Sequence, residues 1–219
     1  MDLYIDTANI VDWAELMPTG LFRGITTNPL LAKRAGLTYP EINWADMAMR
    51  AADLRATQLH AQVFGPEAGW VDWAASLYAH GEAAGIQTVV KVPLTGGGIR
   101  MLPSIRALGG PILVTAAYDA KQMFVACALG ADYIAPYFGR MLEKGLPAYE
   151  AMANMRAIGQ SAGGKTRILV ASLRDTDQMV RLAAEGQDCF TIAPAVARQL
   201  LSDDNTLAAA AEFERATLR

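Results

Sequence analysis

Short apolar runs alternate with longer amphipathic stretches along the whole chain. Eight of these runs are rich in β-branched and aromatic residues, and they are continuously apolar rather than strictly alternating. Continuous apolar runs are typical of strands that are buried on both faces, as in a parallel sheet. The predicted strands cover residues 3–6, 23–27, 60–64, 88–93, 112–116, 133–137, 167–172 and 189–192.

The stretches between these runs carry apolar residues at helical spacing. They predict helices over residues 44–54, 70–84, 120–129, 147–158 and 177–184. Several of these stretches are followed by a glycine, as at Gly85, Gly130 and Gly186, which is typical of a left-handed C-terminal cap. Strands and helices therefore alternate along the chain.

Eight strands alternating with helices predict one (β/α)8 TIM barrel over residues 1–219. The alternative α/β architecture is a doubly wound open sheet. No linker, low-complexity tract or charge run marks a domain boundary. Residues 203–219 carry alanines on one side and charges on the other, so we expect a C-terminal helix that caps the barrel or reaches a neighbouring subunit.

Composition narrows the class of protein. Hydrophobic residues make up 53% of the chain, which excludes a disordered protein. A net charge of −3 argues against a nucleic-acid partner. No apolar run approaches the roughly 20 residues of a membrane span, and the acidic N-terminus lacks the basic start of a signal peptide. We therefore expect a cytoplasmic protein with no nucleic-acid or membrane partner.

Polar side chains stand at the C-terminal ends of the predicted strands, where barrels carry their functional groups. Because these ends meet on one face of a barrel, we expect the side chains to converge there. They are Asp6, Thr26 with Asn28, Gln62, Lys91, Thr115, Tyr137 and Ser172.

Lys91 is the strongest catalytic candidate, because it alone among five lysines is embedded in an apolar strand. Burial there favours the neutral amine, a nucleophile that forms Schiff bases with carbonyls. Asp6, at the end of the first strand, would lie nearby and move protons during imine formation. In the purely structural alternatives, Lys91 extends to the rim or pairs with Asp6, and Asp6 caps the helix that begins near Val11.

A second group of candidates consists of Arg140, Ser172 and Arg174. Two guanidiniums and a hydroxyl on the loops after the sixth and seventh strands would bind a phosphate. In the alternative, the arginines are solvated surface residues. Asn28 either hydrogen-bonds a substrate hydroxyl or forms a plain turn before Pro29. With only two histidines, the chain gives no reason to expect a catalytic zinc site, so we predict no metal.

Two glycine-rich segments need separate interpretations. Residues 159–166 match the sequence motif of a P-loop. A predicted helix precedes them and a strand follows, whereas a phosphate-binding P-loop has a strand before it and a helix after it. We therefore reject nucleotide binding. Residues 96–98 are three consecutive glycines after the lysine strand, and we expect a loop that lets a substrate approach closely or donates backbone N–H groups.

The sequence resembles the transaldolase family, in its small-subunit branch. The matching segments are residues 3–8, 24–29, 90–93 with Thr95, 135–137 with Gly139 and Arg140, and 171–172. The resemblance implies a class I mechanism with no cofactor or metal, and a homo-oligomer that is a pentamer or decamer. The site residues that it implies are Lys91 for the Schiff base with Asp6 and Asn28 beside it, and Arg140, Ser172 and Arg174 for a sugar phosphate.

Within that family, three positions resemble the fructose-6-phosphate aldolases. Gln62, Leu113 and Tyr137 stand where transaldolases usually have Glu, Asn and Phe. An aldolase must protonate the enamine that remains on Lys91 after cleavage. The resemblance implies that Tyr137, Gln62 and Thr115 hold the water that delivers this proton. The alternative is that Tyr137 is a packed aromatic residue whose hydroxyl bonds to the backbone.

The sequence thus predicts a class I aldolase of a sugar phosphate and a ketone donor. Its reaction would be the reversible cleavage of fructose 6-phosphate, or a related ketose, to dihydroxyacetone and glyceraldehyde 3-phosphate. One alternative is a transaldolase, which passes a dihydroxyacetone unit between sugar phosphates. A weaker alternative is a non-catalytic barrel that binds sugar phosphates. Leu173 and the pair Met141 and Leu142 depart from the family pattern, which leaves the natural aldehyde open.

Overall fold

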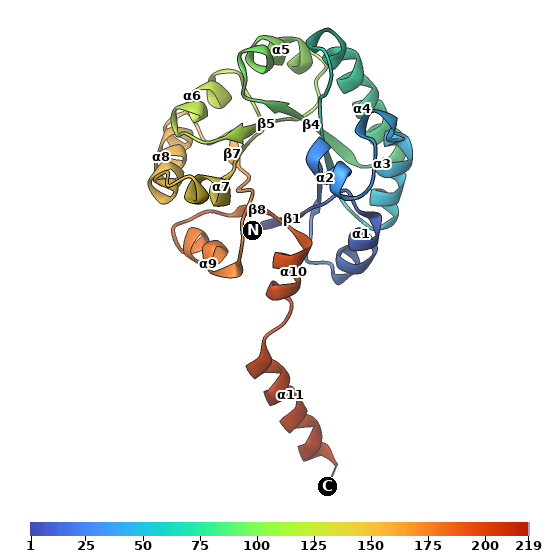
Figure 1. Cartoon of the computed structure of the whole chain (residues 1–219), viewed down its shortest axis with the longest axis vertical. Helices are drawn as coiled ribbons and strands as arrows, with labels where there is room; N and C mark the ends of the chain where they lie inside the picture. Colours follow the sequence, from blue (N-terminus) through green and yellow to red (C-terminus); the bar gives the residue numbers. More distant parts are fainter. Residues whose placement is uncertain (219) are drawn as a thin grey trace.

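Eight parallel strands form a ring inside a layer of helices in the computed structural model, which describes residues 1–218 (Figure 1). The strands pair in the order β7-β6-β5-β4-β3-β2-β1-β8. A bridge between Val170 and Phe190 joins the two ends of this order. The ring confirms the predicted (β/α)8 barrel and excludes the open doubly wound sheet.

Helices lie between successive strands along the chain. The strands are β1 (Asp2–Asp6), β2 (Gly24–Thr26), β3 (Gln58–Gln62), β4 (Gln87–Pro93), β5 (Ile112–Ala117), β6 (Tyr133–Pro136), β7 (Arg167–Ile168) and β8 (Cys189–Ile192). The helices are α1 (Ile10–Leu16), α2 (Pro29–Arg34), α3 (Trp44–Asp53), α4 (Trp70–Ala84), α5 (Gly96–Arg106), α6 (Lys121–Ala128), α7 (Phe138–Glu143), α8 (Ala148–Ser161), α9 (Thr176–Ala184), α10 (Pro194–Leu200) and α11 (Asp204–Thr217). Short 3-10 helices are η1 (Met17–Thr19), η2 (Tyr39–Glu41) and η3 (Glu67–Gly69).

The strands are apolar on both faces because each face packs against a different layer. In β4, Val90 and Val92 belong to the large core between strands and helices. Val89 instead packs with Leu113 in the separate cluster inside the barrel. Successive side chains of a strand point to opposite faces, so Lys91 shares the inner face with Val89. The strand therefore carries the lysine into the barrel interior.

A buried polar network closes the barrel interior near the N-terminal ends of the strands. The Tyr4 hydroxyl donates to Gln58 Oε1 at 2.7 Å, and Gln58 Nε2 donates to Gln87 Oε1 at 2.5 Å. His60 Nε2 lies 3.0 Å from the same Gln58 oxygen. Buried polar groups are rarely left unpaired, and within residues 1–218 this network at the floor of the barrel leaves only His60 Nδ1 without a partner.

We expect Tyr4→Phe to lower the free energy of unfolding by about 1–3 kcal/mol, because it removes a donor from buried Gln58 Oε1. Urea denaturation measures the change. Tyr149→Phe is the matched control, since no hydrogen bond of the Tyr149 hydroxyl is found within residues 1–218, and its effect should stay within about 0.5 kcal/mol. Equal effects of the two variants would contradict a structural role for the network.

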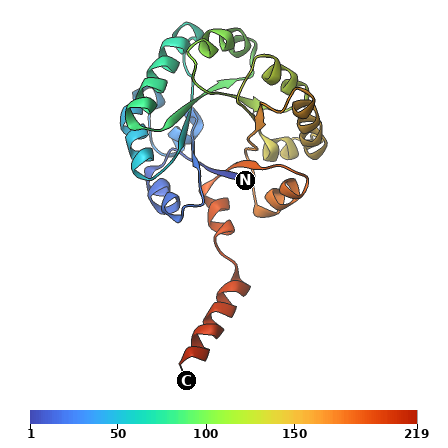
Figure 2. The ribbon, with the colours of Figure 1, turned by 180° about the vertical axis from the view of Figure 1, so that it is seen from behind.

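The C-terminal helix α11 projects away from the barrel in views from opposite sides (Figures 1 and 2). None of its described residues is buried, and Leu207 and Phe213 are 60% and 70% exposed. The expected C-terminal helix is therefore present, but it does not cap the barrel. Contact with a neighbouring subunit stays a prediction, and residue 219 lies outside the described residues. No helix within residues 1–218 has the length and hydropathy needed to cross a bilayer.

The glycines at 96–98 form the first turn of α5, so the expected loop is wrong. Thr95 caps this turn, and its Oγ1 accepts a hydrogen bond from Gly98 N at 3.1 Å. A Cβ on Gly98 would lie only 1.9 Å from the Pro93 carbonyl oxygen. Close approach of the helix to β4, rather than approach of a substrate, therefore explains glycine at this position.

The seventh strand is shorter than predicted, because only Arg167–Ile168 is regular. Ser172 lies in the left-handed region, at φ 66°, where few residues other than glycine are found. Between Ile168 and Ser172, single β-bridges hold the chain to its neighbours, including the bridge from Tyr137 to Ala171. The P-loop-like residues 159–166 span the end of α8 and the turn before β7, which confirms the order that excluded a phosphate loop.

Candidate active site

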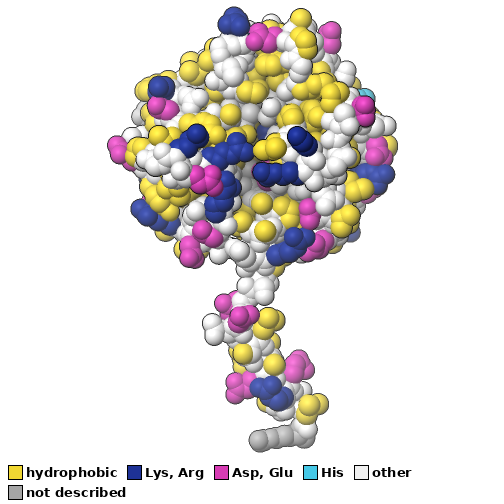
Figure 3. Space-filling model, in the orientation of Figure 1, with side chains coloured by type: hydrophobic (Ala, Val, Ile, Leu, Met, Phe, Trp, Pro, Cys, Tyr) yellow, Lys and Arg dark blue, Asp and Glu magenta, His cyan; other side chains and the backbone are white. Residues whose placement is uncertain are grey.

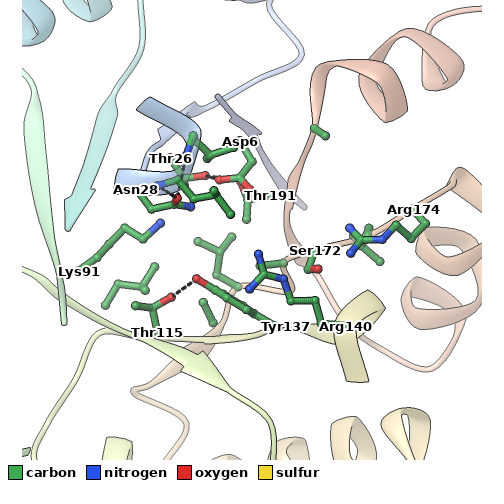
Figure 4. Close-up of a pocket in the computed structure, with 18 of the residues that line it drawn as sticks. Asp6, Thr26, Asn28, Lys91, Thr115, Tyr137, Arg140, Ser172, Arg174 and Thr191 are labelled. Carbon is green, nitrogen blue, oxygen red and sulfur yellow. Dashed lines mark hydrogen bonds between the residues drawn. The ribbon is translucent and has the colours of Figure 1, made fainter. Parts of the chain in front are cut away.

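A cavity of about 310 Å³ opens at the C-terminal ends of the strands. Figure 3 shows a hollow on this face with Lys and Arg side chains on two facing sides. Nine of the ten predicted site residues line the cavity: Asp6, Thr26, Asn28, Lys91, Thr115, Tyr137, Arg140, Ser172 and Arg174 (Figure 4). Gln62 is not among the lining residues of the described chain.

Lys91 lies inside this cavity and is only 4% exposed. Its Nζ donates a hydrogen bond to the Thr27 carbonyl oxygen at 2.7 Å. Burial lowers the pKa of Lys91, and the nearby charge of Asp6 opposes this with a smaller effect. The alternative of a lysine that extends to solvent at the rim is therefore wrong. The neutral, nucleophilic amine is more populated than for a lysine in water.

Asp6 is held at the cavity wall by a chain of hydroxyl groups. Thr26 Oγ1 donates to Asp6 Oδ1 at 2.7 Å, and Thr191 Oγ1 lies 2.5 Å from Thr26 Oγ1. Because Thr26 has one proton and gives it to Asp6, Thr191 donates to Thr26. Asp6 does not cap the first helix, since Asn9 does so by accepting from the Val11 amide. The Asp6 carboxylate therefore lines the cavity and does not bind the amides of the first helix.

We expect Asp6→Asn to lower the pKa of Lys91 further. The Asp6 charge stabilises the ammonium form, so a neutral side chain makes Lys91 lose its proton at a lower pH. NMR titration of the Lys91 side chain measures this, and Asp46→Asn is the control because Asp46 pairs with Arg50 on the outer surface. A rise in the Lys91 pKa in the Asp6 variant would contradict the described electrostatics.

Tyr137 presents its hydroxyl group to the cavity opposite Lys91 (Figure 4). Thr115 Oγ1 donates to the Tyr137 oxygen at 3.2 Å, so the phenolic proton is not used in this bond. Burial raises the pKa of Tyr137, which keeps it protonated at neutral pH. The hydroxyl therefore bonds to a side chain and not, as the alternative required, to the backbone.

An irregularity in β5 lies beside this pair. The register against β6 shifts between Val114 and Ala117, and Ala116 adopts φ 60°. Such bulges redirect neighbouring side chains and occur often next to active sites. Both Leu113 and Thr115 line the cavity. The strand thus presents one apolar and one hydroxyl side chain to the same space.

Asn28 caps α2. Its Oδ1 accepts hydrogen bonds from the amides of Leu30 and Leu31, both at 3.0 Å. Asn28 is therefore the N-cap of a helix and not a plain turn residue, and its bond to a substrate hydroxyl stays a prediction. Asn28 also lines the cavity, so its Nδ2 group remains as a donor for a ligand.

The cationic side of the cavity is built by α7 and the loop after β7. A Cβ on Gly139 would lie 2.0 Å from the Ser172 carbonyl oxygen, so glycine allows this close approach. The Arg140 guanidinium stacks on the Tyr137 ring at 5.0 Å from its centroid. Arg174 Nε donates to Glu143 Oε1 at 2.7 Å. Within residues 1–218, the buried Ser172 Oγ has no hydrogen-bond partner.

The predicted water-holding trio comes together only in part. Thr115 and Tyr137 are hydrogen-bonded to each other in the cavity. The contacts described for Gln62 are those of its backbone, which pairs with Lys91 in the sheet register. The Tyr39 hydroxyl donates to the Gln62 carbonyl oxygen at 2.8 Å. A role for the Gln62 side chain stays a prediction.

Sequence reasoning missed three polar residues that line the cavity, Arg34, Glu143 and Thr191. Thr191 belongs to the last strand and would have been found by examining every polar residue of that strand. No sequence feature marked Arg34 as a cavity residue, because its neighbour Lys33 is also a cation. Only the orientation of α2 distinguishes the two positions. Within residues 1–218, no three His, Cys, Asp or Glu side chains are grouped so as to hold a metal ion.

Comparison with known proteins places this cavity in a family context. Residues 3–218 match the family model described as Transaldolase/Fructose-6-phosphate aldolase. A protein of Ruegeria pomeroyi named "Probable transaldolase" is 32% identical over 208 residues, which cover 92% of this chain and 89% of that protein. A "Probable transaldolase" of Maricaulis maris is 31% identical, over 94% of this chain and 91% of its own length.

Solved structures of other barrels share the architecture. A mandelate oxidase variant superposes with a TM-score of 0.62 at 14% identity, over 89% of this chain and 66% of that one. A structure described as a putative lactate oxidase of Pediococcus acidilactici gives 0.60 at 12% identity, over 89% of this chain and 63% of that one. At these identities the likeness shows the barrel fold alone.

Proposed function

The chain belongs to the transaldolase/fructose-6-phosphate aldolase family, and from that premise we propose that it is a Schiff-base aldolase. Its reaction is the reversible cleavage of fructose 6-phosphate, or a related ketose phosphate, to dihydroxyacetone and glyceraldehyde 3-phosphate. The observation that carries the proposal is the buried amine of Lys91, which lies in the same cavity as Asp6 and Tyr137.

The first half of the reaction uses Lys91 and Asp6. The Lys91 amine attacks the ketone carbon C2, and Asp6 moves the protons as the carbinolamine loses water to give a protonated imine. The C3–C4 bond then breaks, its electron pair passes into the imine, and the Asp6 carboxylate takes the proton of the 4-hydroxyl. Glyceraldehyde 3-phosphate leaves, and an enamine of dihydroxyacetone remains on Lys91.

The second half decides between aldolase and transaldolase. In an aldolase, the enamine carbon C3 takes a proton, and water then hydrolyses the imine to release dihydroxyacetone. The protonated Tyr137 hydroxyl, oriented by Thr115, supports this outcome, because it provides a proton donor inside the cavity. Tyr137 recovers its proton from water.

Transaldolase activity is the second candidate, and the names of the relatives favour it. The proteins of Ruegeria pomeroyi and Maricaulis maris are both named "Probable transaldolase". These names support transfer of the dihydroxyacetone unit better than they support simple cleavage. In that reaction the same enamine on Lys91 attacks a second aldose instead of taking a proton.

A coupled assay tests which reaction occurs. Purified protein is given fructose 6-phosphate alone, and glyceraldehyde 3-phosphate is followed by its enzymatic conversion. The aldolase proposal expects steady formation of glyceraldehyde 3-phosphate without any acceptor. Turnover that requires added erythrose 4-phosphate would replace it with the transaldolase proposal.

A further inference from the structure

We infer that Arg34 is a further binding residue for the phosphate group of the substrate. It acts from the α2 side of the cavity, facing the side that carries Arg140. The inference rests on the proposed function and deepens it, because it makes Arg34 a determinant of selectivity for phosphorylated over neutral aldehydes.

The position of α2 brings Arg34 to the cavity. Figure 1 shows this helix inside the outer layer of helices. Leu30, Leu31 and Arg34 all line the cavity, and their spacing of three and four residues puts them on one face of the helix. Asn28 fixes the start of α2 by capping it from within the same cavity. Arg34 is thus one turn beyond residues that already contact the site.

The pairing of charges leaves Arg34 available for an anion. Arg174 is engaged by Glu143 at 2.7 Å. Within the described chain, neither Arg34 nor Arg140 forms an ion pair with a carboxylate. Two guanidiniums without an ion-pair partner line one cavity of about 310 Å³ and repel each other, and the Asp6 and Glu143 carboxylates that also line the cavity offset part of this repulsion. A phosphate ester carries about −1.5 to −2 charges at neutral pH and relieves that repulsion.

Ser172 gives an independent indication that a ligand binds on the side of the cavity opposite α2. Its Oγ is buried and lacks a hydrogen-bond partner within residues 1–218, although it lines the cavity. Buried hydroxyls are nearly always paired, so this one is explained by a ligand oxygen. Ser172 and Arg140 then hold the phosphate from the β7 side, and Arg34 contacts it from the α2 side.

The test compares Arg34→Gln with Lys33→Gln, a matched control. Lys33 is the adjacent exposed cation of the same helix and does not line the cavity. For the aldol addition of dihydroxyacetone, kcat/KM is measured with glyceraldehyde 3-phosphate and with glyceraldehyde. We expect Arg34→Gln to lower the ratio of the two values about 10- to 100-fold, as for loss of a charged hydrogen bond. Lys33→Gln should keep the ratio of the wild type. An unchanged ratio in Arg34→Gln would overturn the inference.

Binding of inorganic phosphate separates this inference from the proposed function. Calorimetric titration should give a Kd that is about 10-fold weaker or more for Arg34→Gln, with no such change for Lys33→Gln. If the wild type shows no aldolase or transaldolase turnover but phosphate binding depends on Arg34, the function fails and the binding role stands. If turnover is present and neither the ratio nor phosphate binding depends on Arg34, the inference alone fails.

Discussion

Lys91→Arg is expected to lower kcat by at least about 10³-fold, because the loss of a catalytic nucleophile has effects of this size or larger. The guanidinium keeps the positive charge and much of the length of the lysine. It stays protonated at any physiological pH and therefore has no lone pair with which to attack a ketone. Initial rates with fructose 6-phosphate, with and without erythrose 4-phosphate, measure the loss for both candidate reactions.

The control for this prediction is Lys121→Arg. Lys121 is exposed and pairs with Asp119 at the start of α6, outside the cavity. Its replacement should leave kcat within about twofold of the wild type, as for most surface changes. Residual activity of Lys91→Arg above about one tenth of the wild type would contradict a covalent role for this amine.

Tyr137→Phe is expected to change the fate of the enamine rather than its formation. Removal of the hydroxyl takes away the proton donor that Thr115 orients, so cleavage should fall about 10²-fold relative to transfer, as for loss of a general acid. The measurement is the ratio of two rates in one preparation: release of glyceraldehyde 3-phosphate from fructose 6-phosphate alone, and formation of the transfer product with erythrose 4-phosphate.

Tyr118→Phe is the matched control for that ratio. The ring of Tyr118 packs edge-on against Tyr137 at 5.8 Å between centroids, but Tyr118 does not line the cavity. We expect this variant to keep the ratio of cleavage to transfer. If Tyr137→Phe also keeps it, the proton comes from elsewhere and Tyr137 has only a packing role.

The barrel was predictable because each strand obeys one simple constraint. A strand that is buried on both faces must be continuously apolar, so a single lysine within residues 88–93 is conspicuous, and period two assigns it to one face. Helix α4 was predicted with its observed bounds, Trp70–Ala84, because the left-handed Gly85 ends it. Local rules were sufficient for these elements.

Other features depend on tertiary contacts that the pattern of residues does not contain. The seventh strand ends at Ile168, and beyond it Ser172 adopts a positive φ where its carbonyl oxygen lies close to Gly139 of α7. Gly98 looked like part of a flexible loop, but it permits contact between α5 and Pro93. The role inferred for Arg34 depends on the orientation of α2 across the cavity. The sequence alone does not distinguish Arg34 from its neighbour Lys33.

Reduction of a Schiff base by borohydride tests the central claim most directly. The protein is mixed with dihydroxyacetone, treated with borohydride, and analysed by intact mass and by peptide mapping. The account predicts one reduced adduct per chain, located on the peptide that contains Lys91 and absent from Lys91→Arg. No adduct, or adducts spread over exposed lysines such as Lys121, would contradict it and leave a barrel that binds sugar phosphates without this chemistry.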